Sequence, residues 1–277
     1  MESFTLAPSE SEFVLRVVQP IVGPSTVYVF GYRQQSIMKR NFLAADMSGD
    51  ISRHHYYLLV FSKELVPNGG TTLANAIAVA SDHSITATVL VHKVKDLATK
   101  QGGQQWFFDQ VLGNGQRLCV DTAGAPYLFH KVTPRNFAAV TAYWHKCVAV
   151  AQLTVQATID VEQLDVELCK IALLHTAVIQ IALGLIRVFL GYSPNSYSLP
   201  FLLQLCGYFT DLPSQVFHQD TSLQSKRYKM LCATPTMLNH WTKLNADARD
   251  YLGILDACQL FLEESKVLVE NELICVK

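Results

Sequence analysis

Two polar rings, those of His55 and Tyr57, are separated by one residue in a segment predicted to be a β-strand. Successive strand residues point to opposite faces, so these two share a face, and His92 of a later strand could approach them. Such a group could hold Zn²⁺ or another borderline metal, and a protonated imidazole could bind a nucleotide phosphate. The alternative is a structural pair of rings at a strand end, hydrogen-bonded to backbone carbonyls.

Basic residues gather near the same predicted strand: Arg33, Lys39, Arg40 and Arg53. Guanidinium groups match the geometry of phosphate oxygens, so this set could form a phosphate-binding patch. The alternative is ordinary solvated surface charge. Gly31, at the end of the first predicted strand, is expected to make a turn.

A basic, glycine-containing segment with Lys93, Lys95 and Lys100 runs into the aromatic residues 106–108. An aromatic ring beside basic groups can stack on a nucleobase. The alternative is that these three aromatic residues begin a helix and bury their rings.

The predicted secondary structure changes near Pro134, from mostly strands before it to helices after it. Before it, three β-rich runs are predicted to be strands: residues 27–31, 56–61 and 85–92. Between the last two, residues 71–80 suit a helix capped by Thr71 or Thr72. This alternation predicts an α/β domain with a small mixed sheet over residues 1–130.

After Pro134 the apolar residues recur every three or four positions, as in helices. A long amphipathic helix is predicted over 134–158, with Pro134 in its first turn, and a helix apolar nearly all round over 164–190, ending at Gly191. His175 inside the second is expected to be a core histidine. Further helices are predicted over 198–209, 222–232 and 247–271. The fold class is therefore α+β, with an all-α antiparallel helical bundle over 134–277.

Composition excludes several classes of protein. Of the 277 residues, 50% are hydrophobic and 16% charged, with a net charge of -1, which excludes a disordered chain and gives no global basic field for nucleic acid. Seven widely spaced cysteines favour reduced thiols in a cytoplasmic protein. The N-terminus lacks the features of a signal peptide, and the uncharged stretch 171–186, at 16 residues, is shorter than the roughly 20 that a bilayer requires. No membrane association is expected.

The second half resembles the HEPN family, on the long helix, proline-containing turn and leucine-rich helix of residues 173–203, and on Lys226-Arg227-Tyr228 ahead of a last helix. The resemblance implies a helical bundle that pairs as a homodimer. Many members are ribonucleases with an Arg and a His after the proline turn. Residues 194–199 contain neither.

The first half resembles a degenerate nucleotidyltransferase domain of the minimal type. Residues 29–33 resemble its glycine turn, 55–60 its second strand and 107–118 its closing helix, glycine turn and strand, with an insertion at 38–50. Where the family has its carboxylates, this sequence has His55, Tyr57 and His92. The resemblance implies a ligand-binding site that contains Gly31, Tyr32, Arg33, His55, Tyr57 and His92.

The missing carboxylates bear directly on activity. Nucleotidyl transfer uses two Mg²⁺ ions held by carboxylates, and Mg²⁺ prefers oxygen ligands to imidazole. No catalytic residue is therefore predicted, and no cofactor is required, with Mg²⁺ or Zn²⁺ as the alternatives. Replacement acids for an active enzyme would be Asp46, Asp50, Asp96 and Asp109, none of which has the expected strand spacing.

The hypothesis from the sequence is a non-catalytic, cytoplasmic pseudoenzyme that binds a nucleotide, an RNA or a protein partner. The resemblance points to settings such as toxin-antitoxin pairs, defence or stress regulation. The alternative is an active nucleotidyltransferase or a divergent ribonuclease with displaced catalytic residues.

Overall fold

The computed structural model describes residues 6–23, 25–39, 49–64, 66–94, 104–119, 134–161, 167–233 and 246–275, with the backbone alone at 35–39, 49–52 and 275. The chain divides into two compact units, Met1–Arg135 and Asn136–Lys277. The first contains a small mixed sheet, and the described elements of the second are all helices. The predicted α+β class is confirmed.

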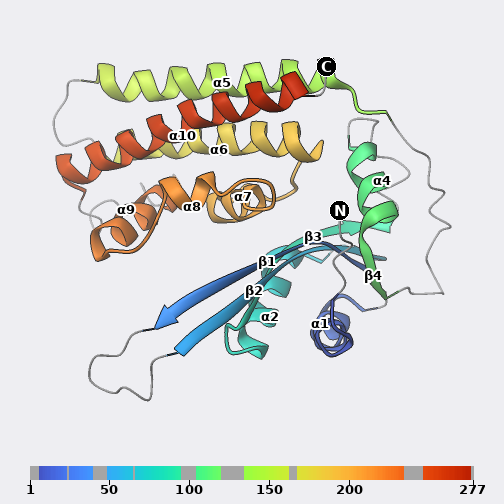
Figure 1. The fold of residues 1–277 in the computed structure, drawn as a ribbon. Coiled ribbons are helices and arrows are strands. Elements are labelled where there is room, and N and C mark those ends of the chain that lie inside the picture. Colours follow the sequence, from blue (N-terminus) through green and yellow to red (C-terminus); the bar gives the residue numbers. More distant parts are fainter. Residues whose placement is uncertain are drawn as a thin grey trace. The chain divides into compact units, whose positions relative to one another are not determined.

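The first unit combines a four-stranded sheet with helices (Figure 1). Its elements are α1 (Pro8–Val22), β1 (Ser25–Lys39), β2 (Gly49–Ser62), α2 (Gly69–Ala80), β3 (Ile85–Lys93), α4 (Gln105–Asn114) and β4 (Gln116–Cys119). The strand order is β3-β2-β1-β4, with β1 antiparallel to β2 and β4, and β2 parallel to β3. The three predicted strands lie within β1, β2 and β3, and the predicted mixed sheet is confirmed.

The strands β1 and β2 form a hairpin much longer than the sequence indicated. They pair from Ser25 with Ser62 out to Lys39 with Gly49, so the expected insertion consists partly of strand. The turn expected at Gly31 is wrong, because Gly31 lies inside β1, next to a break in register that marks a β-bulge. Glycine in a strand interior commonly marks such a bulge. Residues 40–48, including Arg40, lie outside the described residues.

Helices cover both faces of this sheet. One face packs on α1 and α2, with Val14, Val18, Leu73 and Ile77 fully buried against strand residues such as Leu58. On the other face, Phe107 and Phe108 of α4 contact aromatic rings of the strands. The aromatic residues 106–108 therefore begin a helix, as their structural alternative predicted, whereas Lys95 and Lys100 lie outside the described residues.

The start of α2 differs from the prediction. The helix begins at Gly69 after Asn68, which has φ of 51°, so neither Thr71 nor Thr72 caps it. Asn tolerates this left-handed conformation better than most residues. A Cβ at Gly70 would lie 2.5 Å from the carbonyl oxygen of Val89, so only glycine fits where the helix meets β3.

The second unit is built from α5 (Phe137–Asp160), α6 (Glu167–Leu190), α7 (Leu199–Cys206), α8 (Leu212–Val216), α9 (Ser222–Cys232) and α10 (Ala248–Cys275). The helices α5, α6 and α10 lie side by side along their lengths (Figure 1). The short helix α8 was not predicted. Asn136 caps α5 by accepting a hydrogen bond from the Ala139 amide at 3.0 Å, so Pro134 precedes the helix and its predicted place in the first turn is wrong.

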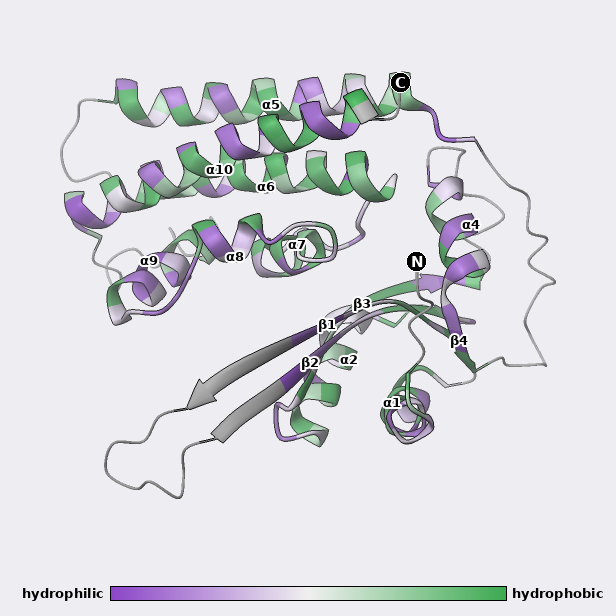
Figure 2. Ribbon diagram, in the orientation of Figure 1, coloured by the Kyte–Doolittle hydropathy of each residue, from purple (hydrophilic) through white to green (hydrophobic). Residues whose placement is uncertain are grey.

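The central helix α6 is the apolar core of this bundle. It ends at Gly191, which has φ of 60°, as predicted, and the Nδ1 proton of His175 is donated to the Leu231 carbonyl at 2.7 Å. With 24 residues, α6 is long and apolar enough to cross a membrane, so the argument from a 16-residue length was wrong. However, 67% of its most apolar window is buried, and it is apolar along most of its length in Figure 2, as expected of a core helix.

Gly184 of α6 faces Trp144 of α5, and a Cβ at Gly184 would lie 2.6 Å from ring atom Cε3 and 2.9 Å from Cζ3. We expect Gly184→Ala to destabilise the helical unit by about 1–3 kcal/mol, because overpacking outweighs the gain in helix propensity of about 1 kcal/mol. Urea unfolding followed by circular dichroism measures this change.

A double-mutant cycle isolates the contact. In a Trp144→Leu background the ring atoms are absent, so the added methyl group should become neutral or stabilising. The same cost in both backgrounds would contradict the packing argument.

Candidate functional site

The hairpin brings most of the predicted site residues to one face of the sheet. Gly31 pairs with Tyr57 and Arg33 with His55. Residues that pair directly across two strands share a face, and Arg53, two positions from His55 on β2, points to the same side. We call the face defined by Arg33, Arg53, His55 and Tyr57 the arginine face. Figure 2 shows a hydrophilic stretch in each of β1 and β2, next to the grey ends of the hairpin.

Two of the predicted site residues lie elsewhere. Tyr32 is on the opposite face, where its ring stacks on that of Tyr56 with centroids 5.4 Å apart. His92 shares the face of His55 but lies six positions further along β3 than the partner of His55, a span of about 20 Å. It is 2% exposed, and its ring centroid is 5.1 Å from that of Phe108. His92 therefore does not meet His55.

Both ring nitrogens of His55 are hydrogen-bonded to threonines of β3. Nδ1 lies 2.7 Å from Oγ1 of Thr86, and Nε2 lies 2.9 Å from Oγ1 of Thr88. The Thr86 hydroxyl donates to the His54 carbonyl at 3.3 Å, so it accepts from His55 Nδ1. This assigns the proton of the ring to Nδ1 and leaves Nε2 to accept from Thr88. The expected partners of His55 were backbone carbonyls, and the threonines were not predicted. Thr86 and Thr88 are two positions apart and therefore share one face of β3.

Burial, followed by the nearby Arg33 guanidinium, lowers the pKa of His55 to about 4. The ring is therefore neutral at pH 7, and the lone pair of Nε2 already accepts a hydrogen bond. A metal needs such a lone pair and a phosphate favours a charged imidazolium, so His55 offers neither. Among the residues that the structure describes, no three His, Cys, Asp or Glu side chains are grouped to hold a metal ion.

Acidic residues are scarce on the strands around His55. The strands β1 and β3 contain no Asp or Glu, and β2 contains only Asp50, which lies five residues from His55, or about 17 Å along the strand. Of the other candidate acids, Asp109 is buried on α4, whereas Asp46 and Asp96 lie outside the described residues. The described part of the arginine face thus carries positive charge without an acidic strand neighbour.

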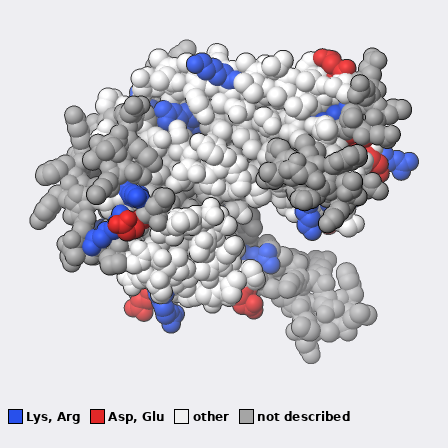
Figure 3. Space-filling model, turned by 180° about the vertical axis from the view of Figure 1, so that it is seen from behind, with Lys and Arg blue, Asp and Glu red and all other residues white. Residues whose placement is uncertain are grey.

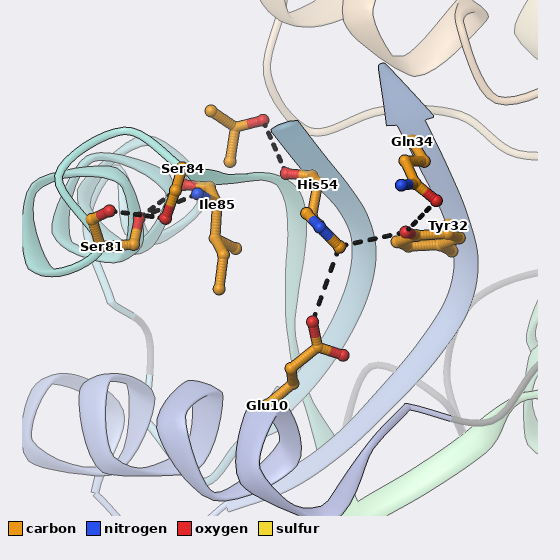
Figure 4. A network of polar contacts seen from close by, with 8 residues as sticks. Glu10, Tyr32, Gln34, His54, Ser81, Ser84 and Ile85 are labelled. Carbon is orange, nitrogen blue, oxygen red and sulfur yellow. Dashed lines mark hydrogen bonds and ion pairs between the residues drawn. The ribbon is translucent and has the colours of Figure 1, made fainter. Parts of the chain in front are cut away.

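The opposite face carries a polar cluster that the sequence did not reveal (Figure 4). Nδ1 of His54 lies 3.0 Å from the Tyr32 hydroxyl and 3.6 Å from a carboxylate oxygen of Glu10. Tyr32 donates to the side-chain oxygen of Gln34 at 3.2 Å, so the His54 proton lies on Nδ1. Burial and the charge of Glu10 raise the pKa of Tyr32. Because Glu10 comes from α1, far away in sequence, no local spacing could have shown this cluster.

No protein-family model, curated protein or solved structure matches this chain. The chemistry of the two faces is therefore inferred from the residues themselves. Arg33, Arg53 and the neutral imidazole of His55 lie on one face, and guanidinium groups favour anions.

The pKa of His55 sets a testable pH dependence. Unfolded histidine has a pKa of about 6.5, so the unfolded state binds the proton first, and stability should fall by roughly 2 kcal/mol as the pH drops from 6.5 to about 4. NMR titration of the ring gives the folded pKa, and chemical denaturation gives the stability. The His55→Gln variant should lack this part of the pH dependence. A folded pKa at or above the unfolded value would contradict the arrangement.

Proposed function

We propose that this protein is a non-catalytic pseudoenzyme of the nucleotidyltransferase–HEPN type that binds a nucleotide or an RNA end on the arginine face. The order of elements supports the proposal, because a mixed sheet with a parallel pair joined by a helix precedes a set of long helices. This order matches the one that the two resemblances imply, a nucleotidyltransferase-like domain followed by a HEPN-like bundle.

One observation carries this proposal. At the positions where the resemblance places metal-binding carboxylates, the chain has a neutral His55 and Tyr57, flanked by Arg33 and Arg53. A transferase uses carboxylates to hold Mg²⁺, and the metal then neutralises the phosphates. Arginine contacts phosphate oxygens directly and carries its own positive charge. The same place on the sheet therefore suits metal-independent phosphate binding.

The distribution of charge favours a small ligand. Figure 3 shows the described Lys and Arg residues of one face scattered, several of them beside an acidic residue. Broad non-specific RNA binding requires many phosphate contacts from a continuous basic surface. A nucleotide or a terminal phosphate needs only a local pair such as Arg33 and Arg53.

The proposal includes a cytoplasmic homodimer. The six cysteines whose side chains are described are free thiols, which fits a reducing compartment. Apolar side chains on the outer faces of α5 and α10 are 41–70% exposed and fit an interface between two copies: Val150, Leu153, Leu260, Val267 and Ile274.

The test is a titration with ATP and with a short 5′-phosphorylated RNA, each in EDTA and in Mg²⁺, read as a shift in melting temperature. A ligand that binds only the folded state stabilises it by about 2.7 kcal/mol at 100 times Kd, and we expect the same shift with and without metal. Arg33→Gln should weaken binding about tenfold or more, because a charge-assisted hydrogen bond is lost.

Arg117→Gln is the matched control, since Arg117 is an exposed arginine on β4 of the same sheet and should leave affinity unchanged. Incubation with labelled ATP and Mg²⁺ tests for activity. A labelled product that is lost in Asp50→Asn or Asp109→Asn would show that the protein is an active nucleotidyltransferase instead. No shift with any nucleotide or RNA would favour a protein partner.

A further inference from the structure

The helical unit contains a pocket of about 150 Å³ between α8, α9 and α10. Its walls combine apolar side chains, among them Phe217, Leu231 and Ile254, with the polar side chains of His218, Gln224, Arg227 and Tyr228. All of these residues belong to the second unit, whereas the arginine face belongs to the first. Sequence analysis had singled out Arg227 only as part of a family-like element.

The guanidinium of Arg227 is held in a fixed place. Nη2 donates to the Arg249 carbonyl at 2.8 Å, and Nε lies 3.9 Å from Oδ1 of Asp250. The group lies against Gly253 of α10, where a Cβ would overlap Nη1 and Cζ. Glycine inside a helix is less favourable than alanine. The absence of a side chain at Gly253 provides the space that the guanidinium occupies.

Arg227 shares its nearest carboxylate with Lys226. Asp250, only 3% exposed, is paired with Lys226 at 2.5 Å, so two cations share this one buried carboxylate. Nε of Arg227 is buried and makes no hydrogen bond within the part of the chain that the structure describes. The Arg227 side chain is 27% exposed and lines the pocket, so an anion there would complete its charge pairing.

A second donor comes from Gln224. Its side-chain oxygen accepts from the Thr221 amide at 3.0 Å in the capping box of α9. Its amide NH₂ has no hydrogen-bond partner among the described residues, and Gln224 also lines the pocket. Arg227 and Gln224 thus supply two donors to a pocket that His218 and Tyr228 also line, and donors suit an acceptor such as a carboxylate.

Size and lining restrict the ligand further. The pocket volume is about 150 Å³. This is smaller than the roughly 300 Å³ at which drug-sized sites begin. A phosphate dianion would leave the apolar walls uncovered, whereas a carboxylate joined to a short apolar group would cover them.

We propose that this pocket binds a carboxylate attached to a small apolar group, with the carboxylate on Arg227 and Gln224 and the apolar group against Phe217, Leu231 and Ile254. Two sources supply this chemistry: a free short-chain carboxylic acid, or the C-terminal carboxylate of a peptide that ends in an apolar residue. Both present the same anion to the guanidinium.

Isothermal titration calorimetry of the full chain tests the proposal with sodium hexanoate against hexanamide, which has the same shape but no charge. A second arm compares a short peptide ending in leucine with its C-terminal amide. Binding is expected for the acids and at least about tenfold weaker binding for the amides, because the charge-assisted bonds are lost. Whichever acid binds more tightly identifies the source.

Substitutions distinguish acid binding in the pocket from unspecific effects on the protein. Arg227→Gln and Gly253→Ala should each weaken acid binding about tenfold or more, the latter because the new methyl group displaces the guanidinium. Lys229→Gln, which removes an exposed cation from α9, the helix that carries Arg227, is the matched control and should change affinity less than about twofold. Circular dichroism checks that each variant folds.

Two results would overturn the proposal: no binding of either acid at millimolar concentration, or equal binding by wild type and Arg227→Gln. Neither result bears on nucleotide binding, because that site lies in the other unit.

Discussion

The pairing of β1 with β2 across the bulge at Gly31 is the constraint on which the candidate site depends. Before the bulge Val29 pairs with Leu58, and after it Gly31 pairs with Tyr57, so β1 gains one residue relative to β2. Without that extra residue Arg33 would oppose His54. A shift of one residue moves every later side chain to the other face of a sheet.

The bulge therefore determines on which face of the hairpin each charged or polar residue lies. It places Arg33 opposite the neutral His55, while His54 stays on the other face with Glu10 and Tyr32. On the face of Glu10, Arg33 would lie on the same side of the sheet as a carboxylate. On the face of His55, its positive charge lowers the imidazole pKa and favours an anion. The anion-binding proposal follows from this separation.

Glycines have a related role in the helical unit, where they make room for a large side chain of a neighbouring helix. Gly184 accommodates the ring of Trp144, and Gly253 accommodates the guanidinium of Arg227. The first contact fixes the packing of α5 on α6, and the second places a charge at the wall of a pocket. Each glycine lowers the intrinsic stability of its own helix. Its missing side chain leaves the space in which the neighbouring helix makes the contact.

Periodicity was sufficient to predict much of the fold. Strand residues around Leu58 and the helix α5 were recognisable because their apolar spacing is local. The bulge, the threonine partners of His55 and the contact of Glu10 with His54 could not be predicted, because each depends on strand register or on residues distant in sequence. His92 shows the same limit. Its residue type suited the site, but the pairing of β2 with β3 places it six positions further along β3 than the partner of His55.

The most direct test of this account is the register itself, measured by cross-strand nuclear Overhauser effects in isotopically labelled protein. The account predicts contacts between the backbone protons of residues 33 and 55, together with contacts between residues 32 and 56. Contacts between residues 33 and 54 would contradict it, because Arg33 would then lie on the face of Glu10 and the separation of charge would be absent.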